Sequence, residues 1–216
     1  MKNGQFIKKL VLIAMLAAVA YIMVFVIRIP VVLFLKYEPK DVIITIGGFI
    51  MGPTAAFVIS LIVSLIEMVT IRETGPIGAL MNLLSTCAFA CSAAFVYKKK
   101  HTIGGAIAGL GVGTVVMVAV MLLWNWLITP FYQGAPREAV EAMLLPIFLP
   151  FNLLKAGLNS AFILGLYKPL VTALRKTRLI DGKEKKSTGS KWGVYALAVG
   201  LLATCIMLLL VFMGKI

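Results

Sequence analysis

Acidic residues are scarce in this chain, and so are the residue patterns that most enzymes need. Aspartate and glutamate together number 8 among 216 residues, and there is one histidine. The sequence contains no Walker-type phosphate loop, no nucleophile elbow and no HExxH zinc motif. These absences predict that the chain is not an enzyme, and that any ATP-driven process it serves takes its ATPase from another subunit.

The few cysteines and the single histidine do not indicate a metal site or a disulfide framework. Cys87 and Cys91 share a helix face at i, i+4, but no histidine or acid stands at ligand spacing, so we interpret them as small packing residues. Cys205 stands alone in a later apolar run. His101 follows three lysines, a position typical of an exposed interfacial side chain. No metal and no cofactor are predicted.

Apolar residues dominate the composition. They make up 61% of the chain, and the mean hydropathy is +1.02. A soluble domain of this size cannot cover so much apolar surface, so the sequence predicts an all-α integral membrane protein. The net charge of +13 does not indicate nucleic-acid binding, because the basic residues flank the apolar runs and do not form a soluble face.

The apolar runs predict six or seven membrane spans. A transmembrane helix needs about 20 mainly apolar residues. Runs of this kind lie at about 8–27, 42–51, 53–70, 76–97, 103–129, 146–173 and 192–213. Gly52-Pro53 cuts the second run short, so residues 42–70 form either two tightly joined helices or one kinked helix. Lys8 and Lys9 precede a full-length run without a small-x-small cleavage site, so the first span is an anchor and not a cleaved signal.

Basic clusters predict the orientation of these spans. They occur before residue 10, at 98–101 and at 175–191, which are alternate connections if residues 42–70 form two helices. The positive-inside rule then places all three clusters and the N-terminus in the cytoplasm. The loops at 36–41, 71–75 and 130–145 face outward, and the last span carries the C-terminus outside.

The loop at 36–41 is the first candidate for a binding site. It places Tyr37, Glu38 and Lys40 between two apolar runs. Buried charge is costly unless it is paired, so a short charged segment entering an apolar bundle is a place where a polar solute is recognised.

Polar residues at membrane depth are the second candidate. Asn152 and Lys155 are spaced i, i+3 and Asn159 continues the same helix face. A lysine near the centre of a span costs about 2.5 to 3.5 kcal/mol, so Lys155 is expected to face a cavity or a partner. The alternatives are that it snorkels to an interface or pairs with an internal acid such as Glu67.

Three further polar residues belong with this group. Asn125 lies between two tryptophans near the outward end of its span, where it either faces the site or forms a helix–helix hydrogen bond. Glu67 and Asn82 are similar cases. All lie toward the outward half of the predicted bundle, around the charged loop.

Small residues form stripes on two spans. Ala14, Ala17 and Ala18 give the first span a small-xxx-small face, which either packs within the bundle or docks a separate membrane subunit. A second stripe, at glycines 105, 109 and 113, is interpreted as packing within the bundle.

Four short segments follow one another in a distinctive order. They are 35–42 (LKYEPKDV), 46–53 (IGGFIMGP), 74–78 (TGPIG) with Asn82 after it, and 150–155 (PFNLLK). Together they resemble the riboflavin-specific substrate-binding (S) components of energy-coupling factor (ECF) vitamin transporters. The resemblance covers roughly residues 5 to 175.

The resemblance implies a fold, a ligand and partners. It implies a six-helix S-component bundle over 1–175 in a bacterial cell membrane, which binds riboflavin as the transported ligand near its outer side. The partners it implies are a transmembrane coupling protein and two cytoplasmic ATPase subunits. Residues 176–191 are then a basic cytoplasmic linker, and 192–216 add a further transmembrane helix outside the resemblance, whose role it does not specify.

The resemblance also implies roles for residues. Asn152 and Lys155 match the pair that hydrogen-bonds the flavin, Asn125 matches a further asparagine of the site, and the 36–41 loop matches the segment that covers the ring. Ala14 and Ala18 match the face that meets the coupling protein. Glu38 stands where aspartate is more usual, and its extra methylene changes the reach of the loop.

The expected ligand suits these residue types. The isoalloxazine ring of riboflavin needs apolar walls and a few converging amide or ammonium groups. Candidates for its ribityl chain are Thr45, Glu67, Thr70 and Asn82. Two alternatives stay open: an S component for another vitamin, and a membrane structural or assembly protein without a ligand.

Overall fold

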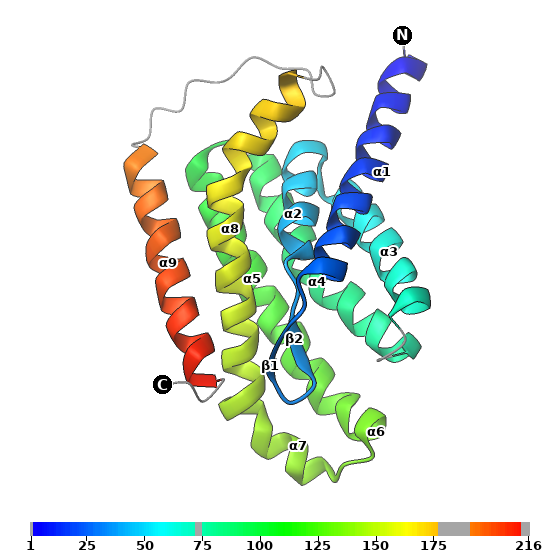
Figure 1. The fold of residues 1–216 in the computed structure, drawn as a ribbon, viewed down its shortest axis with the longest axis vertical. Helices are drawn as coiled ribbons and strands as arrows, with labels where there is room; N and C mark the ends of the chain where they lie inside the picture. Colours follow the sequence, from blue (N-terminus) through cyan, green and yellow to red (C-terminus); the bar gives the residue numbers. More distant parts are fainter. Residues whose placement is uncertain (1, 72–74, 177–190, 213–216) are drawn as a thin grey trace.

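The chain folds into a helical bundle with one short β-hairpin (Figure 1). The computed structural model describes residues 2–71, 75–176 and 191–212. The elements, in chain order, are α1 Lys2–Val26, β1 Ile29–Val32, β2 Leu35–Tyr37, α2 Lys40–Met51, α3 Pro53–Thr70, α4 Gly75–Lys99, α5 Ile103–Leu127, α6 Thr129–Gln133, α7 Arg137–Met143, a π-helical turn η1 Leu144–Phe148, α8 Leu149–Lys176 and α9 Lys191–Phe212.

Among the described residues, six helical segments have the length and apolar composition to cross a membrane. They are α1, α3, α4, α5, the continuous α7–η1–α8 segment and α9. The prediction of an all-α membrane bundle is confirmed. Apart from the short run at 42–51, the observed spans agree with the predicted ones, because a run of some 20 apolar residues has no other way to satisfy its backbone in lipid.

The segment 42–70 is two helices and not one kinked helix. Gly52 has φ 97°, a left-handed conformation that favours glycine, and Pro53 opens α3 at a position where its missing N–H costs nothing. The first of the two, α2, has 12 residues and is therefore about 18 Å long at 1.5 Å per residue. It is too short to cross the bilayer alone, and Lys40–Phe49 are all buried inside the bundle.

The prediction that residues 36–41 and 130–145 are loops is wrong. Residues 29–37 form an antiparallel hairpin in which Ile29 pairs with Tyr37 and Pro30 with Lys36. Lys40 and Asp41 belong to the first turn of α2. The segment 130–145 holds most of α6, α7 and the start of η1. The patterns were missed because a three-residue strand or a five-residue helix is shorter than the periodicity that identifies it.

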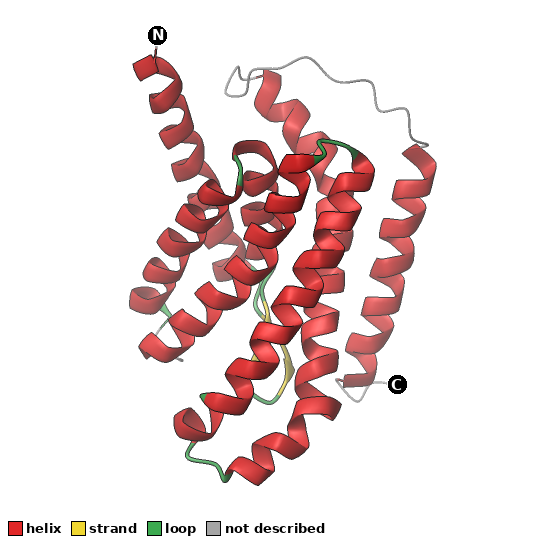
Figure 2. Ribbon diagram, turned by 180° about the vertical axis from the view of Figure 1, so that it is seen from behind, coloured by secondary structure: helices red, strands yellow, loops and turns green. Residues whose placement is uncertain are grey.

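The hairpin enters the bundle and does not extend from it. It crosses in front of α4 and α5 in Figure 1 and behind them in Figure 2. Val31, Leu35 and Tyr37 are buried, whereas Leu33 at the turn is 61% exposed and has φ 51°. One face of this small sheet is therefore part of the protein core.

The glycine stripe of α5 packs within the bundle, as predicted. A Cβ added at Gly109 would lie 2.6 Å from the carbonyl oxygen of Ala93, and one at Gly113 would lie 2.6 Å from that of Phe89. Only glycine allows α5 to approach α4 this closely.

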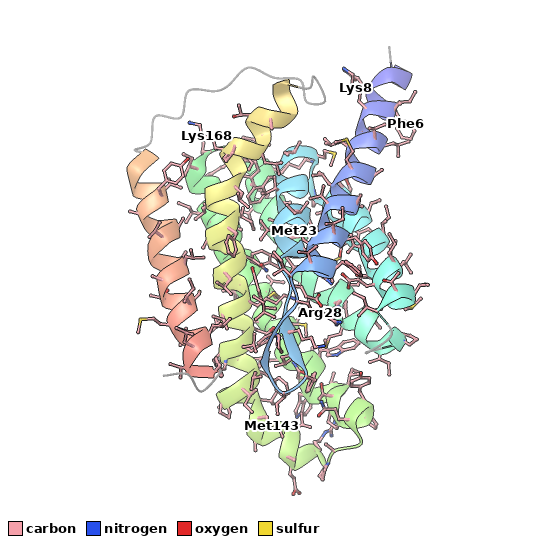
Figure 3. All side chains as sticks on the ribbon, viewed as in Figure 1. Phe6, Lys8, Met23, Arg28, Met143 and Lys168 are labelled. Carbon is pink, nitrogen blue, oxygen red and sulfur yellow. The ribbon has the colours of Figure 1, made fainter. Side chains whose placement is uncertain are left out.

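The basic ends of the helices gather at one end of the bundle. Lys98 and Lys99 close α4, and Lys8 and Lys168 lie toward the same end in Figure 3, opposite to Met143. The start of α9 is at this end, and the last turn of α9 is at the other end (Figure 1).

Candidate binding site

A buried network of charges surrounds the start of α2. Arg28, Lys40 and Lys155 provide positive charge, and Glu38, Asp41 and Glu67 provide negative charge. Among the described residues, three cations and three carboxylates take part, so the cost of burying each charge is offset by a partner of opposite sign.

Lys40 is the centre of one half of the network. Its Nζ lies 2.6 Å from both carboxylate oxygens of Glu67 and 3.1 Å from Oε2 of Glu38. Asn82 donates to Glu67 from 3.2 Å, and Arg28 donates to Glu38 from 2.8 Å. This half therefore ties the end of α1 and the hairpin to α3 and α4.

Asp41 is the centre of the other half. Thr86 donates to its Oδ1 from 2.7 Å, and Asn159 donates to its Oδ2 from 3.3 Å. Lys155 lies 3.3 Å from the same Oδ2, and Tyr37 donates to Oδ1 of Asn159 from 3.1 Å. This half joins β2, α2, α4 and α8.

A cavity of about 50 Å³ opens beside the network, toward the hairpin. Its apolar walls are Phe34, Leu35, Met81, Met121 and Phe151, and its polar lining is Arg28, Lys36, Glu38, Asn82, Ser85, Asn125, Asn152 and Lys155. The hairpin and the residues after it contribute one wall of this cavity, and α4, α5 and α8 contribute the others.

The structure brings the eight predicted site residues into one region, in two layers. Glu38, Asn82, Asn125, Asn152 and Lys155 line the cavity. The other three, Tyr37, Lys40 and Glu67, lie behind this lining and hold it through the network above.

Lys155 faces inward, as expected, but its acidic partner is Asp41 and not Glu67. It also donates to Oγ of Ser85 from 3.3 Å. Sequence reasoning included Asp41 in the charged loop at 36–41 but assigned it no partner. Its role was missed because a pairing between α2 and α8 depends on helix packing.

Two asparagines present amide groups to the cavity. The Nδ2 of Asn152 donates to the carbonyl of Phe148 at 2.7 Å, and the Nδ2 of Asn125 donates to the carbonyl of Met121 at 2.7 Å. Thr129 donates to Oδ1 of Asn125 at 2.9 Å. Each amide keeps a second N–H, and no described residue donates to Oδ1 of Asn152, so both side chains retain hydrogen-bonding capacity for a ligand.

Thr45 and Thr70 do not line the cavity. Thr45 donates to the carbonyl of Asp41 at 2.6 Å, and Thr70 donates to that of Ile66 at 2.8 Å. Both hydroxyls are used within their own helices, which is the usual arrangement for threonine in a helix.

Arg28 is the main site residue that sequence reasoning missed. It lies between α1 and β1 and points toward the centre of the molecule in Figure 3. A charge directly after a span is usually a solvated end, and only the hairpin turns this one back toward Glu38.

The positive groups around Glu38 affect its ionisation. Burial by itself raises the pKa of this carboxyl, but the ammonium groups of Lys40 and Lys155 lower it. The Arg28 guanidinium adds to this effect, so the pKa lies below its ordinary value and Glu38 is a carboxylate at neutral pH.

The arrangement of polar and apolar groups around the cavity suits an organic ligand. Among the described residues, no group of three or more His, Cys, Asp or Glu side chains is placed to hold a metal ion. Converging amide and ammonium groups with apolar walls suit a flat organic ligand that has polar atoms along one edge.

The alanine stripe of α1 divides between two environments. Ala14 and Ala18 are exposed on the outside of the bundle, whereas Ala17 is 3% exposed and packs in the core with residues of α2 and α3. The outer part of the stripe is therefore accessible to another membrane protein.

Comparison with known proteins identifies related sequences. The family model of the substrate-specific component of ECF transporters matches residues 8–167. The riboflavin transporter RibU of Staphylococcus aureus (strain TCH60) is 27% identical over 183 residues, covering 81% of this chain and 96% of that protein. The riboflavin transporter FmnP of Bacillus subtilis (strain 168) is 27% identical over 161 residues, covering 69% and 84%.

A solved structure has the same fold. It is the S component of a bacterial ECF transporter, which matches with a TM-score of 0.66 and 26% identity, over 81% of this chain and 99% of that one.

Proposed function

Because this chain belongs to the family of ECF transporter substrate-specific components, we propose that it binds riboflavin and delivers it to an ATP-driven uptake module. It is a multi-pass membrane protein. Two of its relatives are riboflavin transporters, which supports this choice of vitamin.

The chemistry of the cavity carries the proposal. Phe34, Met81, Met121 and Phe151 provide flat or flexible apolar walls, which suit an isoalloxazine ring. Asn125, Asn152 and Lys155 enter the same cavity with amide and ammonium groups, which suit the donors and acceptors of the flavin imide.

The remaining site residues have supporting or peripheral roles in this proposal. Tyr37, Lys40 and Glu67 position the lining through the buried network. Asn82 and Glu38, at the polar side of the cavity, are the candidates for contact with the ribityl hydroxyls.

The hairpin covers the bound ligand in this proposal. The present cavity of about 50 Å³ is well below the roughly 300 to 1,000 Å³ of sites for small organic ligands. Riboflavin therefore enters only when the hairpin moves away from α4 and α8, and the hairpin closes over it afterwards.

Orientation follows from the distribution of charge. The lysine-rich ends of the helices lie at one end of the bundle, which the positive-inside rule assigns to the cytoplasm of a bacterial cell membrane, together with the N-terminus. The hairpin, α6 and α7 then face outward, where riboflavin is captured.

Transport requires partners in this proposal. The exposed Ala14 and Ala18 offer a surface for close helix approach by the transmembrane coupling protein, which joins the chain to two cytoplasmic ATPase subunits. Ala17 is buried and belongs to internal packing.

A fluorescence titration tests the function. Apo protein in detergent, without ATP, is expected to quench riboflavin fluorescence to an endpoint of one ligand per chain. The freshly purified protein is expected to show a flavin absorbance spectrum. Absence of quenching at micromolar protein, with thermal stabilisation by another vitamin, identifies an S component of different specificity. Absence of stabilisation by any vitamin identifies a structural or assembly role.

A further inference from the structure

The last helix lies outside the part of the chain that the family shares. The family model ends at residue 167, and the solved S component is matched over 99% of its length by 81% of this chain. The helix α9, Lys191–Phe212, is therefore an addition to the common bundle.

One face of α9 packs against the protein. Its buried and half-buried positions recur every three or four residues, and include Val194, Ala198, Leu202, Cys205, Leu209 and Phe212. Residues on other faces, such as Val199 and Met207, are 65% and 62% exposed. This periodicity is that of a helix docked along one side.

The docked face reaches both α8 and the hairpin. A Cβ added at Gly157 of α8 would lie 2.6 Å from Sγ of Cys205, so the two helices approach closely at this point. Cys205 belongs to the same buried apolar cluster as Val31, Leu35 and Tyr37, and Leu202, Leu209 and Phe212 pack against that cluster. The helix also contacts β1 directly.

The same hairpin residues face the ligand cavity. Leu35 belongs to the cluster with Cys205 and also lines the cavity, and Phe34 does the same from the edge of the cluster. The hairpin therefore contacts both α9 and the cavity. A displacement of the hairpin from the cavity therefore also disturbs its packing against α9.

We propose that α9 is a positioning element which holds the β1–β2 hairpin closed over the cavity and slows the release of the ligand. This inference rests on the proposed riboflavin binding. The contacts are apolar and lie away from the polar lining, so α9 changes the rate at which the hairpin opens and leaves the groups that touch the ligand unchanged.

A matched pair of glycine substitutions in the full chain tests the proposal. Gly157→Val places a side chain against Sγ of Cys205 and disturbs the contact between α8 and α9, whereas Gly165→Val adds the same side chain to the same helix where nothing lies within 4 Å. Bound radiolabelled riboflavin is chased with unlabelled riboflavin. We expect dissociation from Gly157→Val to be roughly tenfold faster than from Gly165→Val, because altered closure affects mainly the dissociation rate.

A second pair excludes a defect of α8 itself. Leu202→Ala with Leu209→Ala removes side chains of the docked face, and Leu197→Ala with Leu208→Ala removes the same side chains from exposed positions. Only the first pair is expected to speed riboflavin dissociation and to raise hydrogen exchange of the amides in 29–37.

The outcomes separate the two proposals. The role of α9 is overturned if the matched variants release riboflavin at equal rates and show equal hydrogen exchange of the hairpin amides. This holds even if the parent protein binds riboflavin. If the parent does not bind riboflavin, the proposed function fails. In that case, hydrogen exchange of the amides in 29–37, measured on ligand-free protein, still decides whether α9 holds the hairpin.

Discussion

Lys155 of α8 and Asp41 of α2 form a buried ion pair, with 3.3 Å between Nζ and Oδ2. The Lys155 side chain is 8% exposed and that of Asp41 is fully buried. Asp41 lies in the first turn of the short helix α2, and Lys155 borders the cavity. The pair thus connects the fold of the bundle to the proposed ligand site.

Breaking this pair on one side is expected to destabilise the protein. Lys155→Met leaves the Asp41 carboxylate buried without its cation, and breaking a buried pair in this way costs about 3 to 5 kcal/mol. The double variant Asp41→Asn, Lys155→Met is expected to regain much of this stability, because no uncompensated charge remains. The stabilities of the two single variants and the double variant, measured by thermal unfolding of ligand-free protein in detergent, form a double-mutant cycle. If the losses of stability in the single variants simply add in the double variant, Asp41 and Lys155 are not coupled.

Asn152 is expected to matter for affinity and little for folding. Its Oδ1 is directed to a ligand in the proposal, so Asn152→Ala leaves a polar ligand atom unpaired at a cost of about 1 to 3 kcal/mol. This corresponds to roughly a 5- to 150-fold rise in the Kd for riboflavin. Leu153→Ala, on the lipid side of the same helix, is the control. An unchanged Kd for Asn152→Ala would mean that riboflavin binds elsewhere in the protein.

The approach of α5 to α4 is expected to require glycine at position 109. Gly109→Val places its Cβ against the Ala93 carbonyl, and overpacking of this kind costs about 1 to 3 kcal/mol. Gly111→Val is the control, since nothing lies within 4 Å of a Cβ there. The thermal unfolding midpoints of the two variants decide the point, and similar midpoints would mean that the helices separate easily.

The outer alanines of α1 are expected to matter for transport and not for binding. In the double variant Ala14→Trp, Ala18→Trp, the bulky side chains keep a partner helix at a distance. Riboflavin affinity should persist, while copurification with the ATPase module and uptake by a riboflavin auxotroph should be lost.

Two controls accompany this variant. Ala196→Trp with Ala203→Trp changes exposed alanines of α9 and should preserve uptake. Ala17→Trp enters the core and should lower stability. If the Ala14, Ala18 variant loses riboflavin binding together with uptake, the stripe is internal packing. If uptake persists, docking uses another face.

The two ends of α9 are expected to lie on opposite sides of the membrane. An epitope tag after Ile216 should be accessible from outside the cell, whereas one inserted in 181–191 should not be, because α9 is long and apolar enough to cross. Labelling of intact cells and of permeabilised cells measures this. Accessibility of both tags from one side would mean that α9 does not cross.

The amino-acid sequence by itself determined the class of protein and the positions of the long helices. Apolar runs of membrane length allow no other structure in lipid, and this requirement acts locally along the chain. Gly52-Pro53 likewise marks the boundary of α2 and α3, because only glycine adopts the observed φ of 97° without strain. Asn152 and Lys155 were found from their spacing on one helix and the cost of polar groups in a span.

Only the tertiary structure decided what these polar residues contact. The sequence offered Glu67 as one alternative partner of Lys155, but packing pairs Glu67 with Lys40 and Lys155 with Asp41. The hairpin strands are too short to show a period, and their burial depends on α8 and α9. Ala17 and Ala18 are neighbours in the chain, yet one faces the core and the other faces outward. Such choices depend on which helices meet, and helix packing brings together residues that are far apart in the sequence.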